Sequence, residues 1–333
     1  PTNRGPYRFQ IGSYGVLHPL GSGGMSSVFR AVHLESGHEF ALKVLPPSMA
    51  RNPTILKRFV AEARSAESLQ HPNIVQIYDR GSDDGRYYLV LEYIKGGDLH
   101  DYVQQQGPLA AAEAAGLISQ VARGLEYAAS RGVIHRDVKP SNLLRTPEGE
   151  VKIADLGLAV RPEEDDERVT REGTTVGTVD YMAPEQARDS RATSLQSDIY
   201  SLGCTLYYLL TGQPPYPGGE VIEKLTRPAG TPPPAVRALR PDVPPALAAL
   251  IVRMMAKLPE DRFSTYAELR TALGSWDGEA SSVALVPIDE EPAPPRPIRI
   301  DPPPTTTSEP ALASTSASAS DSYAMPEISL ASL

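Results

Sequence analysis

The chain has 333 residues, of which 41% are hydrophobic and 22% charged, an ordinary composition for a globular protein with about two domains or lobes plus tails. Its formal net charge of −9 argues against a dedicated nucleic-acid binder, which would carry a basic stripe, and its single cysteine, Cys204, excludes a disulfide framework or a cysteine-cluster metal site. We therefore expect a protein of a reducing compartment, the cytoplasm, with no nucleic-acid partner and, because no apolar run is long enough for a bilayer, no membrane span.

The first predicted strands surround a glycine-rich turn. Residues 1–13 are mostly polar residues, glycine and proline, so we expect a flexible lead-in and a fold that begins near Tyr14. The following VLHPLGSGGMSSVFRAV predicts a strand, a turn and a second strand. Glycines let the backbone approach phosphate oxygens closely, although a plain tight turn has the same composition.

The next two predicted elements could form a buried charge pair. Residues 39–45 alternate as a strand around Lys43, and residues 54–69 have the apolar spacing of a helix that carries Glu62. A lysine taken out of water needs an anionic partner, and Glu62 could supply it.

The remainder of the folded part is expected to be mainly helical. Strands at 74–78 and 87–93 are followed by a loose stretch at 95–97, which predicts a hinge between two lobes. Helices are predicted at residues 101–106, 110–131, 197–210, 246–257 and 265–273, and the folded part should end near Trp276. Residues 161–178 are polar and charged, as an adjustable surface segment would be.

The last stretch, residues 277–333, changes to proline, serine, threonine, alanine and glutamate. Such a segment cannot bury enough apolar surface to offset the entropy of ordering it. We expect a disordered tail that serves as a tether or an interaction segment.

The stretch VIHRDVKPSNLLRTPEGEVKIADLGL, residues 133–158, concentrates the groups that phosphoryl transfer requires. Asp137, Lys139 and Asn142 lie in one short loop, and a predicted β-hairpin returns Asp155 to the same neighbourhood. Transfer of a phosphoryl group needs cations, oxygen ligands for a metal ion and an aligned hydroxyl more than covalent chemistry. These residues match those needs.

Nine motifs occur in one order: GSGGMSSV, ALKVL, EARSAESLQHPNIV, LVLEYIKGGDL, HRDVKPSN, DLG, GTVDYMAPE, SDIYSLG and DRF. In this order the chain resembles the eukaryotic-type Ser/Thr protein kinases, of a bacterial kind, from about Tyr14 to Trp276. The resemblance implies an α+β fold of two lobes. A small lobe, residues 14–94, would be a mainly antiparallel sheet with one key helix, and a larger lobe, residues 95–276, would be mainly α-helical.

The resemblance also assigns the catalytic roles. Asp137 would be the catalytic base, and Lys139 would neutralise the γ-phosphate. Asn142 and Asp155 would offer oxygen ligands to Mg²⁺, with Mn²⁺ as an alternative.

The resemblance also implies a binding site for ATP. Glu62 would hold Lys43 against the α- and β-phosphates. The glycine loop would contact the nucleotide through Leu20, Gly21, Ser22, Gly23, Gly24, Met25 and Val28. The adenine would lie between Val28 and Ala41 above and Leu144 below, with backbone bonds from Glu92 and Ile94, and Asp98 would hold the ribose.

Regulatory and scaffold roles are implied in the same way. Arg136 would pair with a phosphorylated residue of the activation segment, since a phosphate orders a loop through arginine contacts. Candidate acceptors are Thr170, Thr174 and Thr175. The structural residues would be Thr178 beside the base, the buried ion pair of Glu185 and Arg262, and Asp198 beneath the catalytic loop.

The chain departs from the family pattern at Leu156, where phenylalanine is usual, and at Ser26, where a third glycine is usual, but neither change removes a catalytic group. We expect an ATP- and Mg²⁺-dependent kinase that acts on Ser/Thr of protein substrates and self-associates to autophosphorylate. The alternative is a pseudokinase or scaffold without catalysis. A small-molecule kinase is disfavoured, because GTVDYMAPE resembles a platform for peptide substrates.

Overall fold

The computed structural model describes residues 7–22, 26–156 and 179–276 of the chain. The predictions that fall outside these residues, and stay predictions, concern Gly23, Gly24 and Met25, the threonines Thr170, Thr174, Thr175 and Thr178, and the tail over 277–333. No helix in the described part of the chain is long and apolar enough to cross a membrane.

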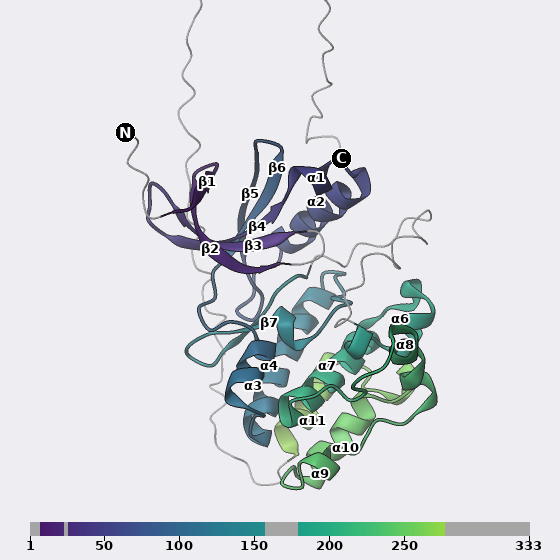
Figure 1. The fold of residues 1–333 in the computed structure, drawn as a ribbon. Helices are drawn as coiled ribbons and strands as arrows, with labels where there is room; N and C mark the ends of the chain where they lie inside the picture. Colours follow the sequence, from purple (N-terminus) through teal and green to yellow (C-terminus); the bar gives the residue numbers. More distant parts are fainter. Residues whose placement is uncertain (1–6, 23–25, 157–178, 277–333) are drawn as a thin grey trace, which may run out of the picture. The chain divides into compact units, whose positions relative to one another are not determined.

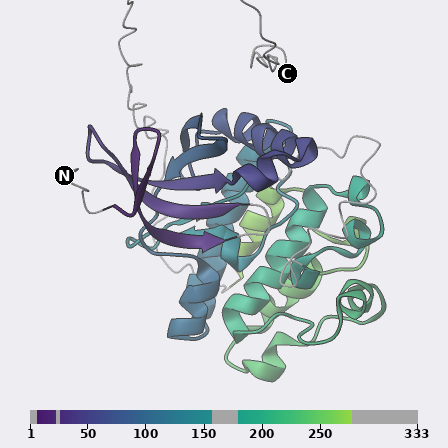
Figure 2. The same cartoon turned by 45° about the horizontal axis from the view of Figure 1, so that its top comes forward.

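A six-stranded antiparallel sheet forms the small lobe, at the top of Figure 1. In the order β1-β2-β3-β4-β6-β5, its strands are β1 (Phe9–Ile11), β2 (Tyr14–Ser22), β3 (Ser27–His33), β4 (Glu39–Leu45), β6 (Arg86–Glu92) and β5 (Ile77–Asp83). Two helices, α1 (Pro47–Ala50) and α2 (Pro53–Glu67), follow β4, and Figure 2 shows the first strands in purple, side by side. The predicted small lobe, an antiparallel sheet with one main helix, is confirmed.

The pleat of β4 determines where Lys43 lies. Phe40 and Leu42 pack into the cluster formed with β1, β2 and β3, whereas Leu45 packs with Phe59 of α2 on the other face. Successive side chains of a strand point to opposite faces, so Lys43 shares the face of Leu45. The strand therefore delivers a lysine that is only 8% exposed to the α2 side of the sheet.

The first strand lies inside the stretch that was expected to be a flexible lead-in. Phe9–Ile11 form β1 and pair with β2, so the expectation for residues 1–13 is wrong at these three residues. Ile11 is fully buried in a cluster with Tyr14, and the Phe9 ring packs edge-on against Phe29 at 5.7 Å. A three-residue strand is too short to produce a periodic pattern in the sequence, so tertiary burial decides its conformation.

The strand predicted at 74–78 is displaced toward the C-terminus and forms β5, Ile77–Asp83. Asp84 (φ 47°) and Gly85 (φ 70°) form a two-residue turn whose positive φ values suit a tight hairpin, so β5 continues as far as this turn. Ile74 instead bridges Ile153 of the large lobe.

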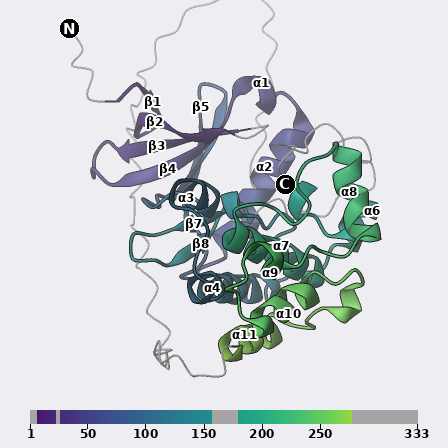
Figure 3. The ribbon, with the colours of Figure 1, turned by 60° about the horizontal axis from the view of Figure 1, so that its bottom comes forward.

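The large lobe is mainly α-helical, as predicted, and within its described residues it carries one two-stranded hairpin (Figure 3). Its helices are α3 (Leu99–Gln106), α4 (Ala111–Ala129), α6 (Pro184–Arg188), α7 (Leu195–Thr211), α8 (Val221–Gly230), α9 (Val236–Leu239), α10 (Pro245–Met254) and α11 (Tyr266–Ser275). The hairpin strands are β7 (Leu143–Arg145) and β8 (Val151–Ile153), and 3₁₀ turns lie at Pro140–Asn142, Val179–Tyr181, Ser190–Ala192 and Pro259–Asp261.

Helix α7 is the core of this lobe. All its residues from Ser197 to Leu210 are buried, and α4, α9 and α10 pack around it (Figure 3). The Ser197 hydroxyl accepts a hydrogen bond from the Ser194 N–H at 3.2 Å, and Gly212 (φ 76°) ends the helix in the left-handed conformation that glycine adopts easily. A helix that is apolar on nearly all sides is buried on all sides, as the sequence predicted.

Close packing of α7 on α10 leads to a stability prediction. A Cβ atom at Gly203 would lie 2.8 Å from Met255 Cγ and 2.9 Å from Met254 Cβ, so Gly203→Val should overpack this contact. We expect the free energy of unfolding, measured by urea titration, to fall by about 1–3 kcal/mol. Gly116→Ala in α4 is the control, because its Cβ would meet no atom within 4 Å, and it should raise stability by about 0.5–1 kcal/mol. Equal effects of the two variants would contradict the packing argument.

Candidate active site

Asp198, in the first turns of α7, holds the backbone of the loop that carries Asp137. This buried carboxylate accepts hydrogen bonds from the N–H groups of His135 (2.9 Å) and Arg136 (2.8 Å) and from the Tyr266 hydroxyl (3.2 Å). Burial raises the pKa of Asp198 above its ordinary value, although the neighbouring His135 and the two N–H groups oppose the rise. The carboxylate therefore holds the loop through the backbone N–H groups of His135 and Arg136.

Arg136 is held in an uncommon backbone conformation. Its φ of 68° lies in the left-handed region, which a non-glycine residue keeps only where the surroundings enforce it. Its N–H donates to Asp198, and its carbonyl accepts a hydrogen bond from Gln186 Nε2 at 2.7 Å. These two contacts fix the turn from which the next residue, Asp137, extends.

Asp137, Lys139 and Asn142 form one hydrogen-bonded group. Lys139 Nζ donates to Asp137 Oδ2 at 2.8 Å, and Asn142 Nδ2 donates to the Asp137 carbonyl at 2.8 Å and to Oδ2 at 3.2 Å. Because the amide nitrogen of Asn142 is used to orient Asp137, its amide oxygen is directed elsewhere. The group can orient a hydroxyl and can provide a lysine for an incoming negative charge.

His135 connects this group to the hairpin. Its buried ring accepts a hydrogen bond from the Asp137 N–H at Nδ1 (3.2 Å), which leaves Nε2 to donate to the Ala154 carbonyl at 3.0 Å. The Ala154 N–H in turn donates to the Asn142 carbonyl at 2.8 Å. His135 thus positions the residue that precedes Asp155.

Lys43 and Asp155 meet although 112 residues separate them in sequence. Lys43 Nζ donates to Asp155 Oδ1 at 2.9 Å, and Lys43 lowers the pKa of this carboxyl below its ordinary value, against the effect of burial. Asp155 has a φ of 57°, and the following Leu156 is buried in the core of the large lobe. An ionised carboxylate next to a lysine can serve as an oxygen ligand for a divalent cation.

The predicted partner of Lys43 is only half described. The backbone of Glu62 lies in α2, but its side chain is outside the described atoms, so the pairing of Glu62 with Lys43 stays a prediction.

The residues predicted around the adenine come from both lobes. Val28 on β3 pairs with Lys43 on β4, and Ala41, next but one to Lys43, is buried. Leu144 on β7 bridges Asp98 at the end of the hinge. The residues expected above the adenine therefore come from β3 and β4, and the residue expected below it comes from β7. Ile94 lies in the linker between the two lobes.

Asp98 also has a structural role that its predicted contact with a ribose did not include. Its side chain accepts the Asp101 N–H at 2.9 Å and so caps the N-terminus of α3, while burial raises the pKa of the carboxyl.

Leu20, Gly21 and Ser22 end β2, on the strand that leads into the glycine loop. Leu20 is exposed, and a Cβ atom at Gly21 would meet no protein atom within 4 Å. Packing within the described part of the chain therefore does not require a glycine at position 21.

Two functional positions were missed in the sequence. Asn73, 2% exposed, donates to the Val151 carbonyl (2.8 Å) and accepts from Arg123, and so attaches the segment after α2 to the large lobe. A Cβ atom at Gly96 would lie 2.0 Å from the Arg145 carbonyl oxygen, so this hinge glycine allows close contact rather than free motion. In the sequence, the polar Asn73 among the apolar residues of HPNIV could have indicated the first position. No feature of the sequence indicated that Gly96 packs closely on another residue.

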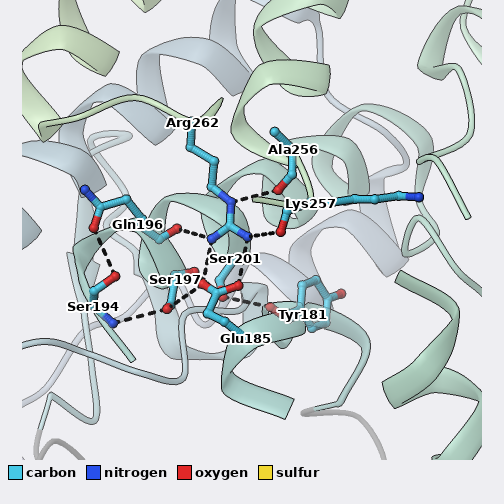
Figure 4. Close-up of polar contacts among 9 residues, drawn as sticks. All are labelled: Tyr181, Glu185, Ser194, Gln196, Ser197, Ser201, Ala256, Lys257 and Arg262. Carbon is cyan, nitrogen blue, oxygen red and sulfur yellow. Dashed lines mark hydrogen bonds and ion pairs between the residues drawn. The ribbon is translucent and has the colours of Figure 1, made fainter. Parts of the chain in front are cut away.

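Glu185 and Arg262 form a buried network (Figure 4). Arg262 Nη1 and Nη2 donate to the two carboxylate oxygens of Glu185 at 2.7 and 2.8 Å, and the arginine also donates to backbone carbonyls of Gln196 and Ala256. The Ser197 hydroxyl donates to Glu185 at 2.8 Å. Burial opposes ionisation of Glu185, but Arg262 outweighs it and lowers the pKa of the carboxyl.

Comparison with known proteins gives one consistent result. The family described as protein kinase domain matches residues 14–272. Serine/threonine-protein kinase PknH of Mycobacterium tuberculosis is 37% identical over 301 residues, covering 89% of this chain, and PrkC of Bacillus subtilis is 36% identical over 265 residues, covering 78%. The solved PknI kinase domain of Mycobacterium tuberculosis aligns with a TM-score of 0.62 at 29% identity, covering 80% of this chain and 98% of that one.

The match to the longer relatives is partial. The chain spans 47% of the length of PknH and 40% of PrkC. What these relatives share with it is therefore the kinase region.

Proposed function

Because this chain belongs to the protein kinase family, we propose that it transfers the γ-phosphoryl group of ATP to serine or threonine hydroxyls of protein substrates. The observation that carries the proposal is the group of Asp137, Lys139 and Asn142 in one hydrogen-bonded loop, together with the Lys43–Asp155 pair. Serine or threonine is favoured by Lys139, which is typical of Ser/Thr kinases.

Each of these residues has a chemical task in the proposal. Asp137 orients the substrate hydroxyl and accepts its proton, and Lys139 neutralises charge on the transferred phosphoryl group. Lys43 binds the α- and β-phosphates, with Glu62 as its support. Thr178 would bond to the base and its lysine.

The family uses ATP together with a divalent metal ion, and we propose Mg²⁺, with Mn²⁺ as an alternative. Asp155 and the amide oxygen of Asn142 are hard oxygen donors, and the described residues contain no cluster of three acidic, histidine or cysteine side chains that would form an all-protein metal site. Two protein ligands suit Mg²⁺, which keeps waters and binds phosphate oxygens. When bound, the ion would neutralise phosphate charge.

The adenine would lie between Val28 and Ala41 on one side and Leu144 on the other. Backbone groups of Glu92 and Ile94 would bind its edge, and Asp98 would bind the ribose. The loop of Leu20, Gly21, Ser22, Gly23, Gly24 and Met25 would cover the phosphates.

Regulation is proposed to act through the segment between Asp155 and Glu185. Autophosphorylation among Thr170, Thr174 and Thr175, in self-associated chains, would provide a phosphate for Arg136. Since ATP is the donor, we propose the cytoplasm as the compartment.

A transfer assay tests this function against the alternative of a scaffold without catalysis. The purified chain, with γ-labelled ATP, Mg²⁺ and myelin basic protein, should place label on serine and threonine, and peptide mapping should locate autophosphorylation on Thr170, Thr174 or Thr175. Repeating the assay with Mn²⁺ decides between the ions. Label no higher than that of Asp137→Asn would refute the kinase function.

A further inference from the structure

Lys152 on β8 forms an ion pair that joins the two lobes. Its Nζ lies 2.9 Å from Glu92 Oε1 and donates to Oε2 at 3.0 Å. Glu92 is the last residue of β6 in the small lobe, and the side chains of Lys152 and Glu92 are only 15% and 24% exposed. A pair this sheltered from water is screened less than a surface pair, so its geometry can constrain its neighbours.

Glu92 is fixed through its backbone as well. Its N–H donates to the Gln76 carbonyl at 2.9 Å, and the Gln76 N–H donates back to Glu92 Oε2 at 3.3 Å. The preceding residue, Val75, donates to the carbonyl of Ile153 on β8 at 2.9 Å. Glu92 therefore contacts β8 directly through Lys152 and indirectly through residues 75 and 76.

The other end of the linker is attached to the same hairpin. The Gly97 carbonyl accepts the Arg145 N–H at 2.8 Å, and Asp98 bridges Leu144. Gly96 approaches the Arg145 carbonyl so closely that no Cβ atom would fit. The linker from Glu92 to Asp98 is thus fastened at both ends to β7–β8, and β7 carries Leu144.

We propose that Lys152 is a positioning residue for nucleotide binding: through Glu92 it holds the hinge backbone in register with Leu144, so that edge and floor of the adenine site form one preassembled unit. The proposal rests on the proposed function, since it needs a nucleotide between the lobes. Preassembly lowers the ordering that binding requires, so the pair should contribute to nucleotide affinity and not to the chemical step.

Lys152→Met tests this inference with two readouts. The dissociation constant of a fluorescent ATP analogue and the KM for ATP should both rise about tenfold, the usual scale for loss of a charge-assisted contact, while kcat stays within about twofold. Lys152→Arg should keep the affinity within about threefold. The matched control is Lys224→Met, which breaks a 2.8 Å lysine pair with Asp180 that is 11% exposed on both sides and lies within the large lobe; its affinity for the analogue should equal that of the wild type.

A double-mutant cycle separates the pair from a general loss of structure. Glu92→Gln should weaken binding of the analogue, and Glu92→Gln with Lys152→Met should be no weaker than Lys152→Met alone, because the coupled contact is lost only once. If Lys152→Met lowers Tm by more than Lys224→Met does, the double variant E92K with K152E distinguishes loss of the pair from a general loss of structure. It restores an ion pair with the charges exchanged, so it should recover affinity for the analogue.

Several outcomes would overturn the proposal. These are unchanged affinity in Lys152→Met, additive effects in the cycle, a swapped pair without recovery, or a lower KM with a higher kcat, which would make the pair an inhibitory restraint. A wild-type chain that neither binds the analogue nor transfers label would overturn the proposed function as well, whereas an active wild type with an unaffected Lys152→Met would overturn this inference alone.

Discussion

Asp137→Asn is expected to lower kcat for phosphoryl transfer by about 10²- to 10⁴-fold, the usual contribution of a positioned general base. Asparagine has the shape of aspartate, but its amide cannot accept the hydroxyl proton and gives Lys139 no anionic partner. In the structure Lys139 Nζ donates to Asp137 Oδ2 at 2.8 Å, so the substitution also removes the negative charge from this contact. The variant should therefore lose the proton acceptor and, at the same time, part of the interaction that positions Lys139.

Nucleotide affinity should change little in this variant, because Lys43 and Asp155 pair with each other and Asp137 takes no part in that contact. We expect the dissociation constant of a fluorescent ATP analogue to stay within about threefold of the wild-type value, as for a residue whose interaction is made in the transition state. Single-turnover kinetics with labelled ATP measure the transfer step. Retention of a tenth of the wild-type rate would exclude Asp137 as the base.

Parts of the fold that depend on local pattern could be predicted. The alternation of apolar residues around Lys43 predicted β4, and the apolar run from Ser197 to Leu210 predicted a buried helix that forms the core of the large lobe. The spacing of Asp137, Lys139 and Asn142 fits within one loop, so their proximity followed from sequence. The contact of Lys43 with Asp155 spans 112 residues and was not predicted, since the family resemblance paired Lys43 with Glu62 and assigned Asp155 to the metal ion.

Other features depend on contacts that leave no local pattern. Lys152 lies between Val151 and Ile153 on a three-residue strand, a pattern that indicates a lysine exposed to solvent. In the structure its side chain instead pairs with Glu92. The glycine pair of the hinge reads as flexibility, yet Gly96 allows close packing on Arg145. Such positions are determined by what the fold brings near them, and the sequence carries no signal for that neighbour.

Arg262→Met is expected to produce the largest loss of stability, about 3–5 kcal/mol in the free energy of unfolding, because it leaves the Glu185 carboxylate buried without its cation. Arg262 is fully buried, and its guanidinium binds both oxygens of Glu185 as well as backbone carbonyls of Gln196 and Ala256 (Figure 4). Methionine preserves the length of the side chain, so the loss reports the uncompensated charge more than a cavity.

The pH dependence of unfolding distinguishes this cause from simple loss of packing. In the wild type the folded-state pKa of Glu185 lies below its ordinary value, so the pair's stabilisation is complete above that value and is lost as the pH falls through the folded pKa. Without Arg262, burial alone should raise the pKa of Glu185, and protonation should then relieve the variant. The stability difference between wild type and Arg262→Met, measured by urea unfolding from pH 7 to pH 4, should therefore shrink as the pH falls. Glu185→Leu added to Arg262→Met should recover part of the loss at pH 7, since it removes the stranded charge. A difference independent of pH, without recovery in the double variant, would show that the network acts through packing alone.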